Sequence, residues 1–199
     1  MITRKEMTRM LLKEGLLSCL ANNSFETVTV TSLCKASGIT RSTFYLHYSN
    51  IMEIVDDLVD DAIAYSNPGM VDNNNLQTIA KTLSAASDSV SLREAYDSIF
   101  DRLPLCQRII RHKKYLPLFL DEQISEYVLQ RIIGREKDRQ GLVMAEALGI
   151  SFDVGVSIFI FLVHGLYAVN KQYKWSQSDE WLEAQKIIFK LVYRGLQSR

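Results

Sequence analysis

The side chains best suited to chemistry in this sequence stand together between residues 38 and 48, which read Gly-Ile-Thr-Arg-Ser-Thr-Phe-Tyr-Leu-His-Tyr. Their guanidinium, hydroxyl and imidazole groups are those that proteins use to contact the phosphates and base edges of DNA. The planar fork of Arg41 fits the O6 and N7 atoms of guanine. Ser42 is small enough to approach a base, and His47 can donate a hydrogen bond to a phosphate. The segment therefore predicts a surface for nucleic acid.

Spacing within this segment separates contacts from anchors. Thr43 and Tyr45 are two residues apart, so on a helix they point to different sides, and one can reach a base edge while the other reaches a phosphate. Phe44 and Tyr48 are four residues apart and share one face, where we expect them to anchor the helix to its neighbours. The alternative is that Tyr45 only packs.

The elements that position this segment are two short helices joined by a tight turn. Thr29 and Thr40 are good N-caps for helices over residues 30–37 and 41–48. Gly38 ends the first of them, because glycine adopts a positive φ without strain. The β-branched residues at the start of that helix are also compatible with a strand, but the helix is favoured. Two such helices with a glycine turn form a helix-turn-helix.

Amphipathic helices are predicted on both sides of this motif. The first covers residues 3–22, and its expected inward-facing stripe consists of Met7, Met10, Leu11, Leu17 and Leu20. The fourth covers residues 50–65, where apolar residues recur at helical spacing from Ile51 to Ile63. The acidic run from Glu53 to Asp61 falls on the opposite face. We expect that run to be solvated and to repel phosphates, which limits the DNA footprint to the helices before it.

Residues 29–48 resemble the DNA-binding segment of the TetR-type (tetracycline-repressor-like) transcriptional regulators. The family pattern is glycine, a small aliphatic residue, serine or threonine, two variable residues, threonine, an apolar residue, tyrosine, a variable residue, histidine or tyrosine, and an aromatic residue. The sequence follows this pattern from Gly38 to Tyr48. The resemblance covers residues 3–63 well, and beyond them it rests on length and helix order.

The resemblance implies that Thr43, Tyr45 and His47 touch DNA and that Arg41 and Ser42 occupy variable, specificity-determining positions. The whole predicted DNA-binding set is Thr29, Thr40, Arg41, Ser42, Thr43, Tyr45, His47 and Tyr48.

Position 51 departs from the family, which usually has a lysine there that meets a phosphate. Ile51 loses that contact, which costs about 1 kcal/mol and makes binding less dependent on salt. Arg4, Lys5 or Lys35 can compensate, because the first 52 residues hold six basic and three acidic residues. The departure puts the contacts to the DNA backbone in doubt more than the function.

A second domain is expected after the turn at residues 66–69. We predict domains over residues 1–65 and 70–199, and the second is expected to be helical throughout. Its predicted helices lie near residues 76–87, 91–103, 105–113, 117–139, 142–148, 152–173 and 178–197.

The resemblance implies that this second domain encloses a small-molecule effector and dimerises through its last two helices. The predicted effector-pocket residues are Phe100, Tyr115, Phe119, Tyr127, Phe159 and His164. Aromatic residues at helical spacing are more often core residues than ligand contacts, and that reading stays open for each of them. The predicted dimer-interface residues are Phe159, Val163, Leu166, Trp181, Ile188, Phe189 and Val192.

Composition excludes several other classes of protein. The 23 basic and 23 acidic residues cancel, which argues against a protein that coats nucleic acid by bulk charge. Three widely spaced cysteines without a CxxC pair favour neither a zinc site nor a redox centre, so we expect no metal and no cofactor. The sequence has no GxSxG, HExxH or glycine-rich phosphate loop, so we expect no enzyme.

The cellular location is expected to be cytoplasmic. The first ten residues are polar and contain no signal-peptide apolar region. Residues 154–170 carry no formal charge, but a spanning helix needs about 20 apolar residues. A buried helix or a subunit interface is therefore favoured over a membrane span.

The preferred hypothesis is an all-α, two-domain, homodimeric regulator that binds a palindromic operator in double-stranded DNA as a repressor and is released by an unknown small molecule. The first alternative is a helical interaction protein in which the helix-turn-helix is only structural. The second is a small-molecule-binding enzyme, for which the sequence offers no acid, base or nucleophile in a familiar spacing.

Overall fold

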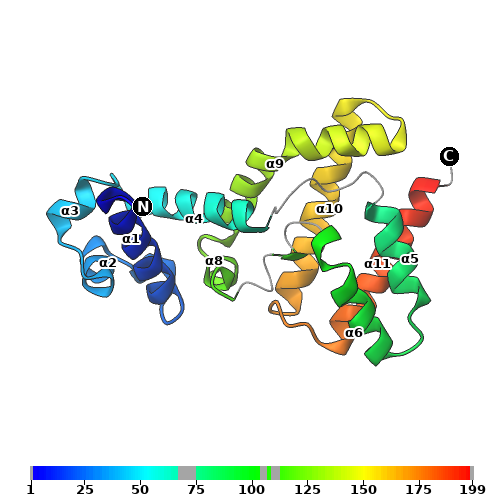
Figure 1. Cartoon of the computed structure of the whole chain (residues 1–199), viewed down its shortest axis with the longest axis horizontal. Helices are drawn as coiled ribbons and strands as arrows, with labels where there is room; N and C mark the ends of the chain where they lie inside the picture. The colour runs from blue at the N-terminus through cyan, green and yellow to red at the C-terminus, as the bar shows by residue number, and fades with distance from the viewer. Residues whose placement is uncertain (1, 67–74, 104–106, 109–112, 198–199) are drawn as a thin grey trace. The chain divides into compact units, whose positions relative to one another are not determined.

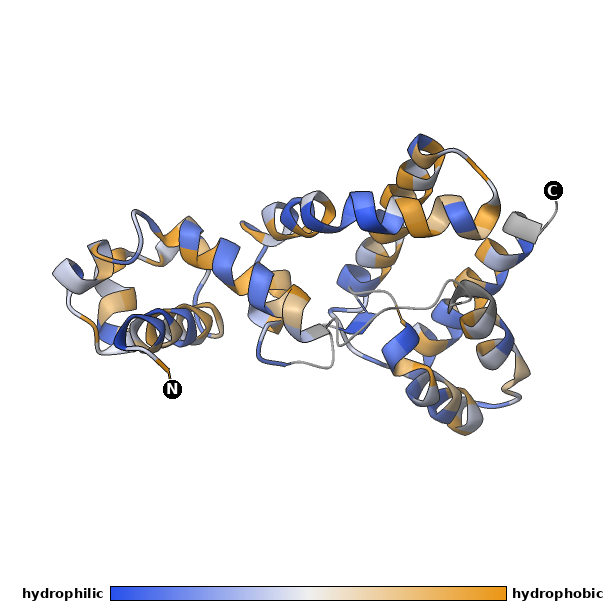
Figure 2. Ribbon diagram, turned by 45° about the horizontal axis from the view of Figure 1, so that its top comes forward, coloured by the Kyte–Doolittle hydropathy of each residue, from blue (hydrophilic) through white to orange (hydrophobic). Residues whose placement is uncertain are grey.

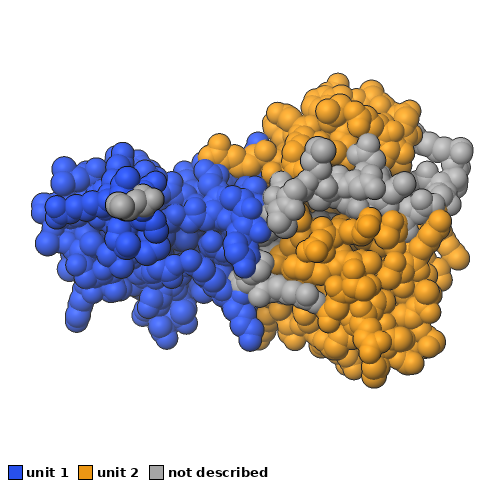
Figure 3. All heavy atoms as spheres, in the orientation of Figure 1, with its two compact units in different colours: residues 1–66, 112–134 blue, residues 67–111, 135–199 orange. Residues whose placement is uncertain are grey.

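A computed structural model of the chain describes residues 2–66, 75–103, 107–108 and 113–197. These residues form helices joined by turns and contain no strand, so the predicted all-α class is confirmed (Figure 1). The chain divides into two compact units (Figure 3). Unit 1 comprises Met1–Ser66 and His112–Gly134, and unit 2 comprises Asn67–Arg111 and Arg135–Arg199. Apolar and polar surfaces alternate around the helices of both units (Figure 2).

Unit 1 begins with α1 (Arg4–Leu20), which Thr3 caps in a reciprocal pair of hydrogen bonds with Glu6. Its buried face consists of Leu12, Gly15, Leu16, Leu17 and Leu20. The prediction that Met7, Met10 and Leu11 face inward is wrong, because all three are exposed. The helix carries apolar residues on more than one side, and the helical period alone does not select the side that packs.

The predicted pair of short helices is present as α2 (Val30–Ser37) and α3 (Arg41–Tyr45), after a 3-10 turn η1 (Phe25–Thr27). The hydroxyls of Thr29 and Thr40 accept hydrogen bonds from backbone N–H groups of α2 and α3, as N-caps do. Gly38 has φ +67°, the left-handed conformation expected for it. The α3 helix ends at Tyr45, earlier than predicted, although a backbone hydrogen bond of 3.0 Å from Tyr48 N to Phe44 O continues the helical turn.

The fourth helix, α4 (Ile51–Ser66), starts one residue later than predicted. Asn50 accepts from Glu53 N over 3.1 Å, while the Glu53 carboxylate accepts from Ser49 N over 2.8 Å. These two hydrogen bonds fix the beginning of the helix. The expected apolar stripe is confirmed at its centre, where the buried side chains are Ile54, Val55, Leu58, Val59 and Ala62.

Residues 112–134 belong to unit 1, whereas the sequence analysis assigned them to the second domain. They include α8 (Leu116–Leu120) and the first part of α9 (Ser125–Leu148). The single predicted helix over residues 117–139 is interrupted at Asp121, whose carboxylate accepts from the backbone N–H groups of Gln123 and Ile124. A buried aspartate that caps a new helix ends the preceding one.

Unit 2 contains α5 (Asn75–Ala85), α6 (Ser89–Ser98), the 3-10 turn η2 (Phe100–Arg102), the rest of α9, α10 (Phe152–Gln172) and α11 (Asp179–Gln197). The predicted helix over residues 105–113 falls largely outside the described residues. The α11 helix packs against α5 and α6 and buries Trp181, Leu182, Gln185 and Phe189.

The predicted break between residues 139 and 142 is absent, because α9 runs without interruption to Leu148. Gly141 lies where α9 meets α10. A Cβ atom on Gly155 of α10 would collide with the carbonyl oxygen of Gly141 and lie 3.0 Å from Ala145 N. These two glycines therefore allow a close helix–helix approach, because neither carries a Cβ atom.

Within the described part of the chain, α10 is long and apolar enough to cross a membrane by length and composition. Core helices of other proteins pass the same test, so the finding is weak evidence for a membrane span. Only 22% of its most apolar window is buried inside the chain. The helix therefore presents much apolar surface that the other described residues leave uncovered.

Candidate nucleic-acid interface

The α3 helix is held in place by two aromatic side chains on one face. Phe44 is fully buried and Tyr48 is 3% exposed, and their ring centroids lie 6.3 Å apart. The Tyr45 ring packs edge-on against Phe44 at 5.0 Å but remains exposed. The two anchors predicted from the spacing of four residues are thus confirmed.

The α3 and α8 helices lie at opposite ends of unit 1 (Figure 1).

The outer surface of α3 carries the groups that could contact a ligand. Arg41, Ser42 and Tyr45 are exposed, and so is Leu46, to which the sequence analysis gave no role. The signal for Leu46 was available, because it is two residues from each of the buried rings and therefore about 200° around the helix from both. A leucine was overlooked there because apolar residues are normally assigned to the core.

Three hydroxyls gather at the beginning of α3. Thr40 Oγ1 lies 3.0 Å from Ser42 Oγ and 2.8 Å from Thr43 Oγ1, and it accepts a hydrogen bond from Thr43 N over 3.2 Å. Thr29 is similarly engaged with Ser32 at the beginning of α2. The two caps are exposed, so their hydroxyls can still reach a neighbouring acceptor.

Tyr48, predicted to contact DNA, is buried inside unit 1. Its hydroxyl donates to Asp57 Oδ2 over 2.5 Å, and the Arg9 guanidinium lies 4.9 Å from its ring centroid. Burial, followed by the bond to Asp57, raises the pKa of Tyr48. A phenol that is buried and already bonded inside unit 1 is a packing residue. This agrees with the anchoring role that its spacing from Phe44 predicts.

His47 is half-buried, and the two sides of its ring differ. Its Nδ1 atom is buried and has no hydrogen-bond partner among the described residues. A hydrogen bond from this ring to a ligand would therefore have to involve its other nitrogen, Nε2. The position is compatible with the predicted bond to a phosphate.

The acidic run of α4 is engaged rather than solvated, which corrects the expectation from its sequence. Asp57 pairs with Arg9 and Asp61 with Lys13, both from α1. Asp56 accepts a hydrogen bond from the Tyr127 hydroxyl over 2.7 Å and forms an ion pair with Arg131 Nε at 2.8 Å, and these two partners lie on α9. The spacing of the acidic residues shows which face of α4 is polar. It does not show that basic residues from other helices pair with that face.

These pairs divide the basic residues near the N-terminus into two groups. Arg9 and Lys13 are occupied by α4. The remaining basic residues up to position 52 are exposed and form no ion pair with a described residue; they are Arg4, Lys5, Lys35 and Arg41. Ile51 stands half-buried at the first position of α4. Any attraction of residues 1–52 for phosphates therefore depends on these four side chains more than on the total charge of this segment.

The six residues of the predicted effector pocket are distributed over both units. Those in unit 1 are Tyr115, Phe119 and Tyr127. The first two are buried there, and burial together with the bond to Asp56 raises the pKa of Tyr127. Those in unit 2 are Phe100, Phe159 and His164. No described contact brings the six together into one pocket, so the pocket remains a prediction.

A cluster of buried polar side chains, which sequence reasoning missed, lies inside unit 2. The Tyr96 hydroxyl donates to Gln107 Oε1 and Gln107 Nε2 donates to Gln185 Oε1, both over 2.9 Å. Trp181 Nε1 donates to Asn170 Oδ1 over 2.9 Å, and its ring packs edge-on against that of Tyr96 at 5.1 Å. All five side chains are at most 1% exposed.

Two amide nitrogens of this cluster, Asn170 Nδ2 and Gln185 Nε2, have no hydrogen-bond partner among the described residues. The orientation of Asn170 is fixed, because an indole is only a donor and must face the amide oxygen. If both glutamine amides are turned over, the unsatisfied atom at the end of that chain is still on Gln185. A buried donor without an acceptor costs about 1–3 kcal/mol, so an additional group such as a water or a ligand would stabilise the cluster.

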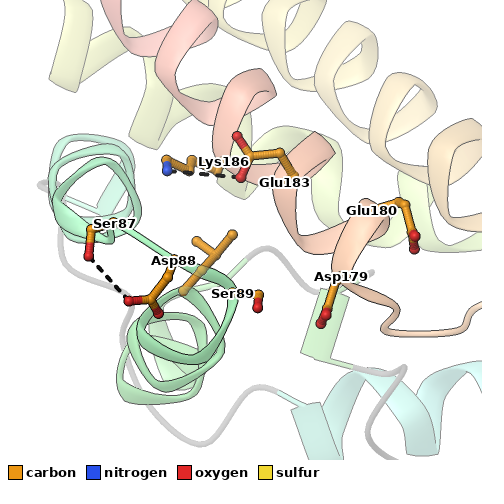
Figure 4. A pocket seen from close by; sticks show the side chains of 8 residues that line it. Ser87, Asp88, Ser89, Asp179, Glu180, Glu183 and Lys186 are labelled. Carbon is orange, nitrogen blue, oxygen red and sulfur yellow. Dashed lines mark hydrogen bonds and ion pairs between the residues drawn. The ribbon is translucent and has the colours of Figure 1, made fainter.

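An open pocket of about 330 Å³ lies between the beginnings of α6 and α11 in unit 2 (Figure 4). Four carboxylates and Lys186 line it, but several are occupied: Asp88 caps α6, Asp179 pairs with Arg93, and Lys186 donates to Ala86 O. None of the six predicted effector residues lines this pocket.

The predicted dimer-interface residues fall into two groups. Val163, Leu166, Trp181 and Phe189 are buried within the protomer, whereas Phe159, Ile188 and Val192 are half-buried. The four buried side chains belong to the core under the surface of α10 and α11, so they cannot contact a second chain without rearrangement. The apolar side chains that α10 and α11 present most openly are Phe161, Ile187 and Leu191.

The part of the chain that the structure describes holds no group of three or more His, Cys, Asp or Glu residues placed to bind a metal ion. Cys19 and Cys34 are free thiols, and burial raises the pKa of both. Comparison with protein-family models gives no match, and no curated protein is significantly similar to the chain.

Proposed function

We propose that the protein is a TetR-type, DNA-binding transcriptional regulator. In this proposal α2 and α3 act as a helix-turn-helix, and α3 enters the major groove as the recognition helix. The protein represses by occupying a palindromic operator and is released when a small molecule binds to the second domain.

The observation that carries the proposal is the division of α3 into a buried and an exposed face. Phe44 and Tyr48 fix the helix to unit 1, while Arg41, Ser42 and Tyr45 remain exposed. A helix that reads bases needs a rigid attachment and free polar side chains near its beginning. Four basic side chains without ion pairs in the same unit supply the attraction for phosphates.

Dimerisation through α10 and α11 is part of the proposal. Phe161 is 74% exposed on α10, and Ile187 and Leu191 stand four residues apart on one face of α11. A two-fold dimer buries such surfaces and places two recognition helices on half-sites about one helical turn of DNA apart. Membrane insertion of α10 is the competing explanation for its uncovered surface, and purification without detergent as a stable dimer would exclude it.

Effector binding is assigned to unit 2. The buried amides of Asn170 and Gln185, each with a nitrogen that no described residue satisfies, support a site for a polar molecule in its interior. Phe159 and His164, on the same helix as Asn170, remain predictions for this site that rest on the sequence alone. An effector lowers DNA affinity only by the difference between its affinities for the two states of the protein.

Unit 1 also contains contacts through which such a change could reach α3. Asp121 accepts from Phe25 N over 2.7 Å, next to the beginning of α2. Asp121 also fixes the beginning of α9, and α9 contributes residues to both units. A displacement of this helix would therefore act on the segment that leads into the helix-turn-helix.

The test is selection of bound sequences from random DNA, followed by affinity measurements at several salt concentrations. We expect a palindromic consensus and an affinity that falls with added salt. If no sequence is enriched and no salt-dependent binding is found, the helix-turn-helix is structural and the interaction-protein hypothesis takes its place.

A further inference from the structure

Leu46 occupies the outermost position of the turn that continues α3. Its side chain is 81% exposed, more than any other large apolar side chain that the structure describes. Its backbone is right-handed helical, with φ −74° and ψ −18°. The side chain therefore points away from Phe44 and Tyr48 and contributes little to the core of unit 1.

Ser42 shares this outermost line, because it precedes Leu46 by four residues. Thr43 and Tyr45 stand to either side of the line, and Tyr45 leans against the Phe44 ring at 5.0 Å. The surface that α3 presents farthest from unit 1 thus consists of one small side chain and one branched apolar side chain. Leu46 has no hydrogen-bond donor, so its position does not suit a phosphate, which requires donors.

We propose that Leu46 is a specificity-determining residue that reads a thymine through its C5-methyl group. The proposal rests on the proposed function, in which the outer face of α3 lies in the major groove. Base edges there are polar except for the thymine methyl, which apolar side chains contact. Guanine, adenine and cytosine would leave the apolar side chain against donors and acceptors that lose water without gaining a hydrogen bond.

The experiment uses the full chain and the operator selected from random DNA. Each thymine of one half-site is replaced in turn by uracil, which removes the methyl group and leaves the hydrogen-bonding edge unchanged. We expect one thymine at which the replacement weakens binding about fourfold, the effect of one buried carbon. In the Leu46→Ala variant the same replacement should cost less than about 1.5-fold, because contacting groups are energetically coupled.

Two further variants separate this contact from general effects. Leu120→Ala is the matched control, since Leu120 is 48% exposed at the end of α8 and belongs to the same unit. It should keep the full fourfold response to uracil. Leu46→Met keeps an apolar side chain and should keep most of the response, and the melting temperatures of all three variants should equal that of the wild type because both positions are exposed.

The outcomes distinguish this proposal from the function on which it rests. If DNA is bound with a consensus but no thymine shows a response that Leu46→Ala removes, the assignment of Leu46 is wrong while DNA binding stands. If Leu120→Ala removes the response equally, the effect is indirect and the assignment is also wrong. If no DNA is selected, the proposed function fails first.

Discussion

At the residue scale, the structure separates side chains that hold α3 from side chains that are free to act. Phe44 on α3 and Tyr48 just after it are buried, whereas Arg41 and Ser42 remain exposed on α3. This separation makes substitutions on the outer face informative, because they should change recognition without changing the fold.

Replacing Arg41 by alanine should cost about 1–3 kcal/mol at one base pair of each half-site and relax the preference there. The matched control is Lys35→Ala, an exposed base on α2, which should weaken binding to all sequences alike. Competition assays with single-base operator variants measure both effects. An equal loss on every sequence for Arg41→Ala would mean that it contacts only phosphate.

Replacing Ile51 by lysine should steepen the plot of log affinity against log salt by about 0.9, the increment for one more neutralised phosphate. Ile51 is half-buried at the first position of α4, where a long side chain can extend to solvent. Met52→Lys adds the same charge one residue later and serves as the control. A lower melting temperature with an unchanged salt slope would show that Ile51 is a core residue away from the DNA.

At the element scale, the sequence predicted those helices whose ends are marked by side-chain chemistry. Thr29, Gly38 and Thr40 fixed α2 and the start of α3 because caps and a left-handed turn depend on local contacts. The inward face of α1 and the engagement of Asp57 were not predictable, since both depend on partners far along the chain. The close approach of α9 and α10 at Gly141 was not predictable for the same reason, because it depends on contact between the two helices.

Asp121 should be a positioning residue for the segment that enters α2. Replacing it by alanine leaves the backbone N–H groups of Phe25, Gln123 and Ile124 without acceptors and should destabilise unit 1 by about 1–3 kcal/mol. Hydrogen exchange should accelerate at the Phe25 amide. The exposed Asp138 on α9 provides the control, and its alanine variant should stay within about 0.5 kcal/mol of the wild type. Unchanged exchange at Phe25 would contradict this role.

Two glycines on α10 should respond in opposite ways to alanine. Gly155→Ala forces a Cβ atom against the α9 backbone and should destabilise unit 2 by about 1–3 kcal/mol. A Cβ atom added to Gly165 would point into open space, so Gly165→Ala should stabilise unit 2 by about 0.5–1 kcal/mol. Thermal unfolding of the two variants measures the difference. Equal effects would mean that α9 and α10 do not approach closely.

At the scale of the whole molecule, the uncovered apolar surface is assigned to a second copy of the chain. The double variant Ile187→Glu and Leu191→Glu should sediment as a monomer and lose affinity for the palindrome, while its secondary structure is retained because both side chains are exposed. Val90→Glu, at another exposed apolar position on α6, is the control and should remain dimeric. A monomeric wild type at micromolar concentration would overturn the assignment.

The internal pairing of Arg9 and Lys13 with α4 has a consequence for how the proposed regulator would search a chromosome. Residence on unrelated DNA is governed by the number of counterions that a protein displaces. A chain that neutralises two of its own N-terminal cations displaces fewer counterions from DNA. It should therefore dissociate quickly from random sequences and return to solution between encounters. Such a protein would locate its operator by repeated collisions more than by sliding, and its occupancy would follow its concentration in solution closely.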